Sequence, residues 1–148
     1  MKIRITILGM LLSTTTLFAQ YTSVESLVES YSKRDGVSYT HVGKNMVWMA
    51  KAAAPKGAMD GVENIHILKF DNRISALYST FHASADSLFT ALGAELVAAE
   101  PTKKGSMEVY MERKERPTEY MTFEYSNKGD TTFMWMSGNL PSSLAANQ

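Results

Sequence analysis

The C-terminal third of the chain contains three short runs in which apolar and polar residues alternate. The runs are SMEVYMERK, EYMTFEYS and TTFMWMSG, and the stretches between them, ERPT and NKGD, contain proline, glycine and aspartate. Alternation with a period of two is typical of β-strands, and the glycine in NKGD indicates a hairpin. Strands joined by so few residues can pair only antiparallel, so the chain has to build an antiparallel sheet.

The strongest helical pattern lies upstream of these strands. Apolar residues recur at spacings of three and four from Ile74 to Leu92, after a potential N-cap at Asp71 and before a glycine. A helix with such a stripe needs a sheet to pack against. Two shorter helices are predicted in KNMVWMAKAAAP and in YTSVESLVESYSKRDG, where Thr22 and Glu25 form a capping-box pattern.

Three further segments, VSYTHVG, VENIHILKF and ELVAAEP, are predicted to be strands. Apolar residues occupy both sides of VENIHILKF, with Ile65 and Ile67 on one side and Leu68 and Phe70 on the other, which indicates a central strand covered on both faces. The order of elements predicts an α+β fold: a largely antiparallel sheet of about five to six strands, with two to three helices packed mainly on one face. One domain is expected over residues 20–148, with a short tail from about residue 141.

Residues 1–19 are predicted to be a signal peptide. Lys2 and Arg4 precede an apolar run from Ile5 to Phe18, and Ala19 offers a small residue for cleavage. The run is interrupted by hydroxyl residues and is shorter than the ~20 apolar residues that a spanning helix needs. We therefore expect an exported protein, periplasmic or secreted, without a stable membrane anchor after cleavage; an uncleaved anchor is the alternative.

The composition excludes several classes of site and partner. After residue 19 the chain has thirteen basic and fifteen acidic residues, a net charge of −2 with the signs mixed, and so offers no field for nucleic acid or an anionic membrane. The absence of cysteine excludes disulfides, thiolate metal ligands and a lipid-modified N-terminal cysteine.

Several of these segments together resemble a known family. They are YSKRDGVSYTHVGKNMVWMA, the strand VENIHIL, and the closing MEVYMER, EYMTFEY and FMWMSGNLPSSL, in which Leu140 and Leu144 follow Gly138. The pattern is similar to the family of domain of unknown function 4252. The resemblance implies a small exported protein of Gram-negative envelopes, often encoded beside extracytoplasmic-function sigma factors. It implies no activity, cofactor or catalytic residue.

No segment carries a catalytic signature. Nucleophilic catalysis needs a Ser, Cys or Thr beside a base, but the chain has no G-x-S-x-G motif, P-loop or dinucleotide fingerprint. His41, His66 and His82 lie in three different segments. We expect His66 in the core and His82 in a surface contact with Asp86, four residues further on. These observations predict a protein that is not an enzyme and holds no cofactor.

The methionines around the two tryptophans raise the hypothesis of a Cu(I) site, because thioether sulfur is a soft ligand. In a strand, Met134 and Met136 share one face and Trp135 points to the other, so Trp135 cannot cap a metal that its neighbours hold. In the predicted helix, Met46 and Met49 share a face, which is also the spacing of a buried stripe. Methionine readily fills core gaps, so we expect these residues in the core and predict no metal site.

Strand alternation divides the C-terminal hairpins into two faces. If the NKGD turn pairs Ser126 with Thr131, the face expected to pack against the long helix carries Met107, Val109, Met111, Met121, Phe123, Tyr125, Met134 and Met136. The other face mixes aromatic residues with glutamates, and its candidate interaction surface consists of Tyr110, Tyr120, Phe133 and Trp135. Alternatively, the first helix or the tail covers this face, and a register slip of one residue would exchange the faces.

The resulting hypothesis is an exported, non-enzymatic α+β domain of the cell envelope. It would bind a protein partner, either another protein or a second copy, through the outer face of the sheet. The family resemblance adds a link to extracytoplasmic-function sigma regulation. The alternatives are a small-molecule or copper-binding protein, and an enzyme of unrecognised type.

Overall fold

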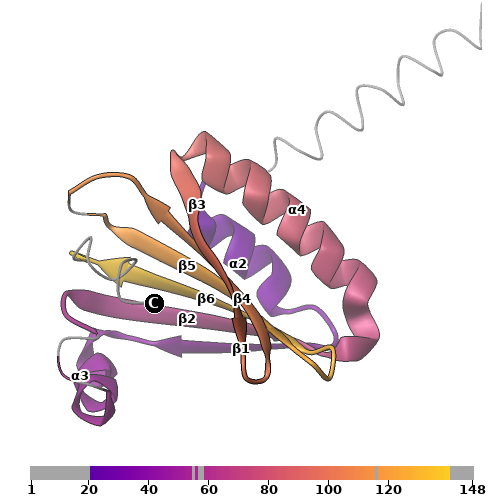
Figure 1. Ribbon diagram of the computed structural model, residues 1–148, viewed down its shortest axis with the longest axis horizontal. Helices are drawn as coiled ribbons and strands as arrows, with labels where there is room; N and C mark the ends of the chain where they lie inside the picture. The colour runs from indigo at the N-terminus through magenta and orange to yellow at the C-terminus, as the bar shows by residue number, and fades with distance from the viewer. Residues whose placement is uncertain (1–20, 55, 57–58, 116, 141–148) are drawn as a thin grey trace, which may run out of the picture.

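The computed structural model describes residues 21–54, 56, 59–115 and 117–140, which form a six-stranded sheet and three α-helices (Figure 1). The predicted signal peptide and the predicted tail from about residue 141 lie outside the described residues. The strand order is β1-β2-β6-β5-β4-β3, and every neighbouring pair is antiparallel. The predicted α+β fold is confirmed.

The elements follow one another as the sequence predicts. Their bounds are α2 Val24–Ser32, β1 Val37–Val42, α3 Lys44–Ala53, β2 Val62–Phe70, the 3₁₀ turn η1 Asn72–Ile74, α4 Ser75–Ala91, β3 Ala94–Thr102, β4 Gly105–Glu112, β5 Glu119–Ser126 and β6 Thr131–Gly138. Helix α2 is capped by Ser23 rather than Thr22, because the Ser23 hydroxyl accepts the Ser26 N–H at 3.1 Å and the Ser26 side chain closes the capping box.

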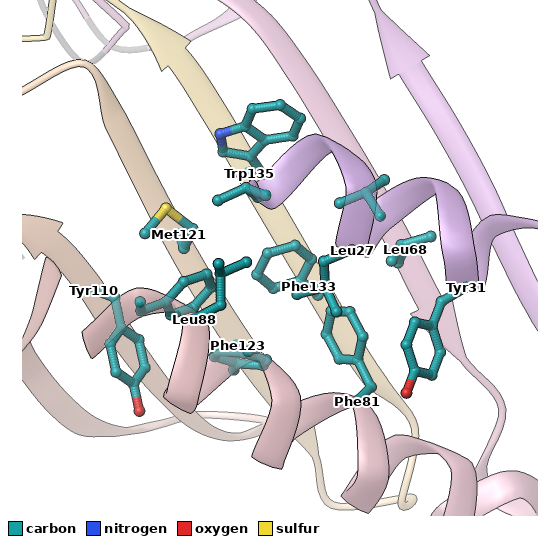
Figure 2. Packing of buried hydrophobic residues seen from close by; sticks show 14 of the residues in the cluster. Leu27, Tyr31, Leu68, Phe81, Leu88, Tyr110, Met121, Phe123, Phe133 and Trp135 are labelled. Carbon is teal, nitrogen blue, oxygen red and sulfur yellow. The ribbon is translucent and has the colours of Figure 1, made fainter. Parts of the chain in front are cut away.

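Helices α2 and α4 cover one face of the sheet, which we name the helix face (Figure 1). The core here is rich in aromatic rings, and the Phe133 ring lies 5.0 Å from the rings of both Phe81 and Phe123 (Figure 2). Aromatic side chains bury more area than any others, which explains why this face packs against the long helix. The buried residues with the least exposure on this side are Leu27, Leu68, Phe81, Ala85, Phe89, Phe123 and Phe133.

The opposite face, which we name the outer face, holds a second buried cluster. Val47 of α3 and Leu140, which follows β6, pack there. The sheet contributes Val62, Ile65, Val109, Met111 and Tyr120, with Met107, Met134 and Met136 half-buried beside them. Strand β2 is therefore covered on both faces, as predicted. Helix α3 lies near the ends of β1 and β2, apart from α2 and α4 (Figure 1).

The predicted register of the last hairpin is wrong by one residue. The Ser126 N–H bonds to the Asp130 carbonyl at 2.9 Å, and Tyr125 pairs with Thr131. The hairpin loop has three residues rather than four, because Gly129 takes the left-handed conformation (φ +90°) that such a loop requires. Strand β5 keeps its predicted orientation, with Met121 and Phe123 toward the helices, whereas β4 and β6 are turned over relative to the prediction.

This slip changes which side chains share a face. Phe123 lies opposite Phe133, and Met121 lies opposite both Trp135 and Tyr110. These five residues face the helices, whereas the methionines of β4 and β6 face the outer side. The prediction that the long helix packs on this face is therefore right for the β5 residues and wrong for the residues of β4 and β6.

Candidate functional site

The four residues of the predicted interaction surface are buried and do not form an exposed patch. Their exposed fractions are 6% for Tyr110, 1% for Tyr120, 0% for Phe133 and 8% for Trp135. Tyr110, Phe133 and Trp135 lie beneath the helices, while Tyr120 belongs to the outer-face cluster. The register slip separates Tyr120 from the others, and the helices cover the rest.

Strand β1 is an open edge of the sheet in the part of the chain that the structure describes. It pairs with β2 without a bulge from Val37 to Val42, and the residues from Ser38 to His41 are exposed. The strand VSYTHV contains no proline, lysine, arginine or acidic residue. It therefore lacks the features that usually keep an edge strand from pairing with another chain.

Strand β3, at the other edge, carries such protection. Its register shifts at Val97, between Leu96 and Ala98, and Pro101 lies near its end. Glu95 forms an ion pair of 2.6 Å with Arg113. A bulge, a proline and charged side chains all discourage further strand pairing, so the two edges of this sheet differ in their capacity to accept a new strand.

A row of stacked rings crosses β1, β2 and β6 on the helix face. His41, His66 and Trp135 lie directly opposite one another on β1, β2 and β6. The His41 and His66 rings are 4.1 Å apart and the His66 and Trp135 rings 4.4 Å apart, both stacked. The Tyr39 hydroxyl lies 2.7 Å from Nδ1 of His66. We name Tyr39, His41, His66 and Trp135 the ring stack.

The protonation of the ring stack follows from its partial burial. Burial, and then the neighbouring His41, lower the pKa of His66 to about 4, so the imidazole is neutral at pH 7. Burial also raises the pKa of Tyr39. Both effects favour the neutral forms of Tyr39 and His66, whose hydroxyl and Nδ1 share one hydrogen bond. The edge of β1 is thus held to β2 by a side-chain bond as well as by the backbone.

A hollow of about 800 Å³ lies beside the β1 edge on the helix face. It is lined by Tyr21, Ser26, Glu29, Ser30, Ser32, Lys33 and Tyr39. Burial is the main cause that raises the pKa of Tyr39, and the carboxylates of Glu29 and Glu25 raise it further. Both glutamates belong to α2, so this helix lies close to β1. A strand added at the β1 edge would direct alternate side chains over this hollow.

Helix α3 exposes large apolar side chains. The exposed fractions are 59% for Met46, 65% for Trp48 and 53% for Met49, whereas Val47 is 2% exposed. The prediction that Met46 and Met49 lie in the core is wrong, because α3 turns Val47 toward the outer-face cluster instead.

A second polar cluster lies between α4 and the sheet. Tyr125 donates a short hydrogen bond to Glu108, and Nε2 of His82 lies 3.4 Å from the same carboxylate. The structure therefore places His82 beside Glu108 of β4, instead of in the predicted contact with Asp86. Burial raises the pKa of Tyr125 and of Tyr78, so both remain neutral phenols. The cluster fits a polar network that fastens α4 to the sheet.

Neither cluster provides a complete metal centre. Among the described residues, no group of three or more His, Cys, Asp or Glu side chains is placed to hold a metal ion. The half-buried Met134 and Met136 are separated from Met107 by β5, which contributes Tyr120, Thr122 and Glu124 on this face.

The geometry defines a class of protein: an α+β domain with a six-stranded antiparallel sheet, two helices on one face and one unprotected edge strand. A family model described as Domain of unknown function (DUF4252) matches residues 31–145, and the chain belongs to this family. The predicted family is thereby confirmed. No curated protein and no solved structure matches the chain. None of the helices in the described ranges is long and apolar enough to span a membrane.

The open edge of β1 and the exposed face of α3 were not predicted from the sequence. The absence of charge in VSYTHV was a signal for the first, but it becomes informative only when the strand is known to lie at an edge. The aromatic residue Trp48 was a signal for the second, because tryptophan between methionines suits either a core or a contact surface.

Proposed function

We propose that this protein is an exported, non-enzymatic protein-interaction module of the cell envelope, and that it associates with a second copy through the edge of β1. The observation that carries the proposal is the contrast between the two edges: β3 is protected, whereas β1 is exposed, regular and uncharged. The proposal includes a role in extracytoplasmic-function sigma regulation. The signal-like residues 1–19 support export. The family resemblance supports the regulatory role.

The backbone groups available for pairing follow from the β1–β2 ladder. The Asp71 N–H donates to the Gly36 carbonyl at 3.2 Å. Residues in an antiparallel ladder alternate between bonding inward and outward, so Ser38 and Thr40 bond to β2. Tyr39 and His41 then present their N–H and C=O groups at the open edge.

A second copy suits this edge because the strand is complementary to itself. Antiparallel pairing of two β1 strands with Tyr39 of one opposite His41 of the other uses the four outward groups of Tyr39 and His41 in each strand. The two-fold axis then passes between the two copies of Thr40, a favourable cross-strand pair. The exposed Asp35 and Lys44 flank β1 at opposite ends, so this register brings Asp35 of one copy near Lys44 of the other.

The strength of this association can be bounded. Four backbone hydrogen bonds at about 1 kcal/mol each contribute about 4 kcal/mol, before the cost of association. Side-chain contacts of Tyr39 and Thr40 and two exposed ion pairs add to this. If these side-chain contributions only offset the cost of association, about 4 kcal/mol remains, which corresponds to a weak dimer with a Kd of about 1 mM; concentrations from about 0.1 to about 3 mM bracket this value.

Sedimentation equilibrium of residues 20–148 over this concentration range tests the proposal. Thr40→Lys places two lysines directly opposite each other in the dimer and should weaken it at least about ten-fold. Ser38→Lys is the matched control, since it adds the same charge to an exposed position on the same strand and face, away from the two-fold axis. Mixing Thr40→Lys with Thr40→Glu protein should restore association.

A wild-type protein that stays monomeric throughout this range would overturn the proposed self-association. Equal weakening by Thr40→Lys and Ser38→Lys would overturn the register. If the monomer instead crosslinks to another envelope protein through β1, the interaction function stands with a different partner.

A soft-metal-binding function is the second candidate, and the exposed thioethers of Met46 and Met49 favour it. The two side chains are three residues apart on α3 and so share a face. Cu(I) titration of the wild type and of the Met46→Leu/Met49→Leu variant distinguishes this function, because leucine keeps the apolar surface and removes both sulfur ligands. Uptake that is unchanged in the variant would exclude a site at these methionines.

A further inference from the structure

We infer that α3 is a membrane-surface helix that docks on an anionic phospholipid bilayer, with Met46, Trp48 and Met49 among the headgroups. The exposed lysines beside them would contact the lipid phosphates. This inference goes beyond the proposed pairing of β1 and depends on a different element, with Lys44 the one residue that enters both.

The orientation of α3 leaves an apolar face directed away from the protein. Successive residues of an α-helix are rotated by about 100°. With Val47 packed inward, Met46 and Trp48 lie to either side of it and Met49 lies nearly opposite. The only other residues that face outward with Met49 are small or polar and uncharged: Asn45, Ala52 and Ala53. A surface helix normally turns its charged residues outward, so α3 has the reverse arrangement.

The charges around α3 complement an anionic surface. Lys44, Lys51 and Lys56 are exposed, and the sequence from Lys44 to Met59 contains no acidic residue. Neither Lys44 nor Lys51 takes part in an ion pair with any described residue. Glu63 of β2 lines a hollow of about 330 Å³ with Lys44 and Lys51 and offsets part of their charge from the protein side. The near-neutral balance of the whole chain conceals this local positive segment.

A bilayer suits this helix better than a protein partner does. Stable protein interfaces bury about 800 Å² on each partner, more than one ten-residue helix with three large apolar side chains provides. Figure 1 shows α3 at a corner of the molecule, away from α2 and α4, where a flat surface can reach it. Interfacial helices typically carry tryptophan and methionine on one side and lysines at the margin of that side. The aliphatic stems of such lysines extend toward the lipid headgroups.

The test uses vesicles of phosphatidylglycerol and phosphatidylethanolamine, and vesicles of phosphatidylcholine, each containing brominated lipid as a quencher. Trp48 is 65% exposed and Trp135 is 8% exposed, so quenching by lipid reports on Trp48 in the unmodified protein. We expect quenching and a blue shift with the anionic vesicles at low salt, and much less with phosphatidylcholine. The Trp48→Phe variant should lose the quenching signal.

Two double variants separate the apolar and charged contributions. Met46→Ser/Met49→Ser should weaken binding at least about ten-fold by removing apolar area. Lys44→Gln/Lys51→Gln should weaken it about 30-fold, about five-fold for each lysine, and reduce its salt dependence. Leu96→Ser and Lys103→Gln/Lys104→Gln are the matched controls, because these residues are exposed on β3 and its turn, and they should bind as the wild type does.

The absence of quenching with anionic vesicles at low salt would overturn the inference. So would equal losses in the α3 variants and the controls, because binding would then not depend on α3. A blue shift that appears without vesicles and grows with protein concentration would assign α3 to a contact between copies and would overturn the membrane role. The β1 variants are expected to leave vesicle binding unchanged, so the two proposals can fail separately.

Discussion

The pH dependence of stability provides a quantitative test of the ring stack. His66 lies between the rings of His41 and Trp135, and burial followed by the charge of His41 lowers its pKa from 6.5 to about 4. Between these two values the unfolded chain binds a proton at this residue and the folded protein does not. The free energy of unfolding must therefore fall as the pH is lowered from about 7 toward 4, whereas above about pH 7 this residue has no effect.

The expected size of this effect can be estimated from the position of His66. A drop in pKa from 6.5 to about 4 would correspond to about 3 kcal/mol for a fully shielded group. His66 is half-buried, so solvent screening reduces the expected loss to about 1–2 kcal/mol. This is a substantial part of the 5–15 kcal/mol that typically stabilises a domain of about this size.

Urea unfolding of the wild type and of two variants across this pH range measures the effect. His66→Phe keeps a flat ring in the stack and His66→Gln keeps a polar group, but neither titrates. Both should lose about 1–2 kcal/mol of the pH dependence, although they differ in stability at pH 7. Curves for wild type and both variants that run parallel from pH 7 to 4.5 would refute the reasoning. So would an NMR titration of the His66 ring with a midpoint near 6.5.

Two further predictions concern the core and the backbone. Phe123→Ala should destabilise the protein by about 3–5 kcal/mol, because the ring is fully buried among Phe81, Phe133 and other rings. Phe123→Leu should destabilise it less. Similar urea midpoints for the two variants would contradict this packing. Gly61→Ala should destabilise the protein far more than Gly93→Ala, although both glycines have φ near +80°. A Cβ at Gly61 would lie 1.8 Å from a backbone oxygen, whereas a Cβ at Gly93 would meet nothing within 4 Å. Thermal unfolding should show a loss of about 1 kcal/mol for Gly93→Ala and several times more for Gly61→Ala, and equal losses would contradict this.

Local patterns in the sequence predicted the elements well. The stripe from Ile74 to Leu92 corresponds to α4, and the alternating runs correspond to β4, β5 and β6. These patterns depend on residues that are close together in the chain, so the sequence displays them directly. The family resemblance was also visible at this level, because it consists of apolar positions along these same elements.

The candidate site was predicted less well, because it depended on the strand register and on which face of the sheet the helices cover. Pairing Ser126 with Asp130 instead of Thr131 reverses β6 relative to β5, so that Phe133 and Trp135 lie on the face opposite to Tyr120. A strand repeats every two residues, so a slip of one exchanges all of its inward and outward side chains. The alternation within β4 and β6 does not distinguish the two registers, because both sides of each strand contain large apolar residues.

By itself the sequence determined the identity and order of the helices and strands, the α+β class and the family. Only the tertiary structure decided that β6 lies between β2 and β5, that β1 is left as an open edge, and that the helices cover the aromatic face of the sheet. The pairing of β2 with β6 joins segments that are far apart in the chain, so no local periodicity records it. It is selected by the burial of Phe133 and Trp135 beneath α2 and α4, and that burial leaves β1 and α3 as the surfaces available for partners.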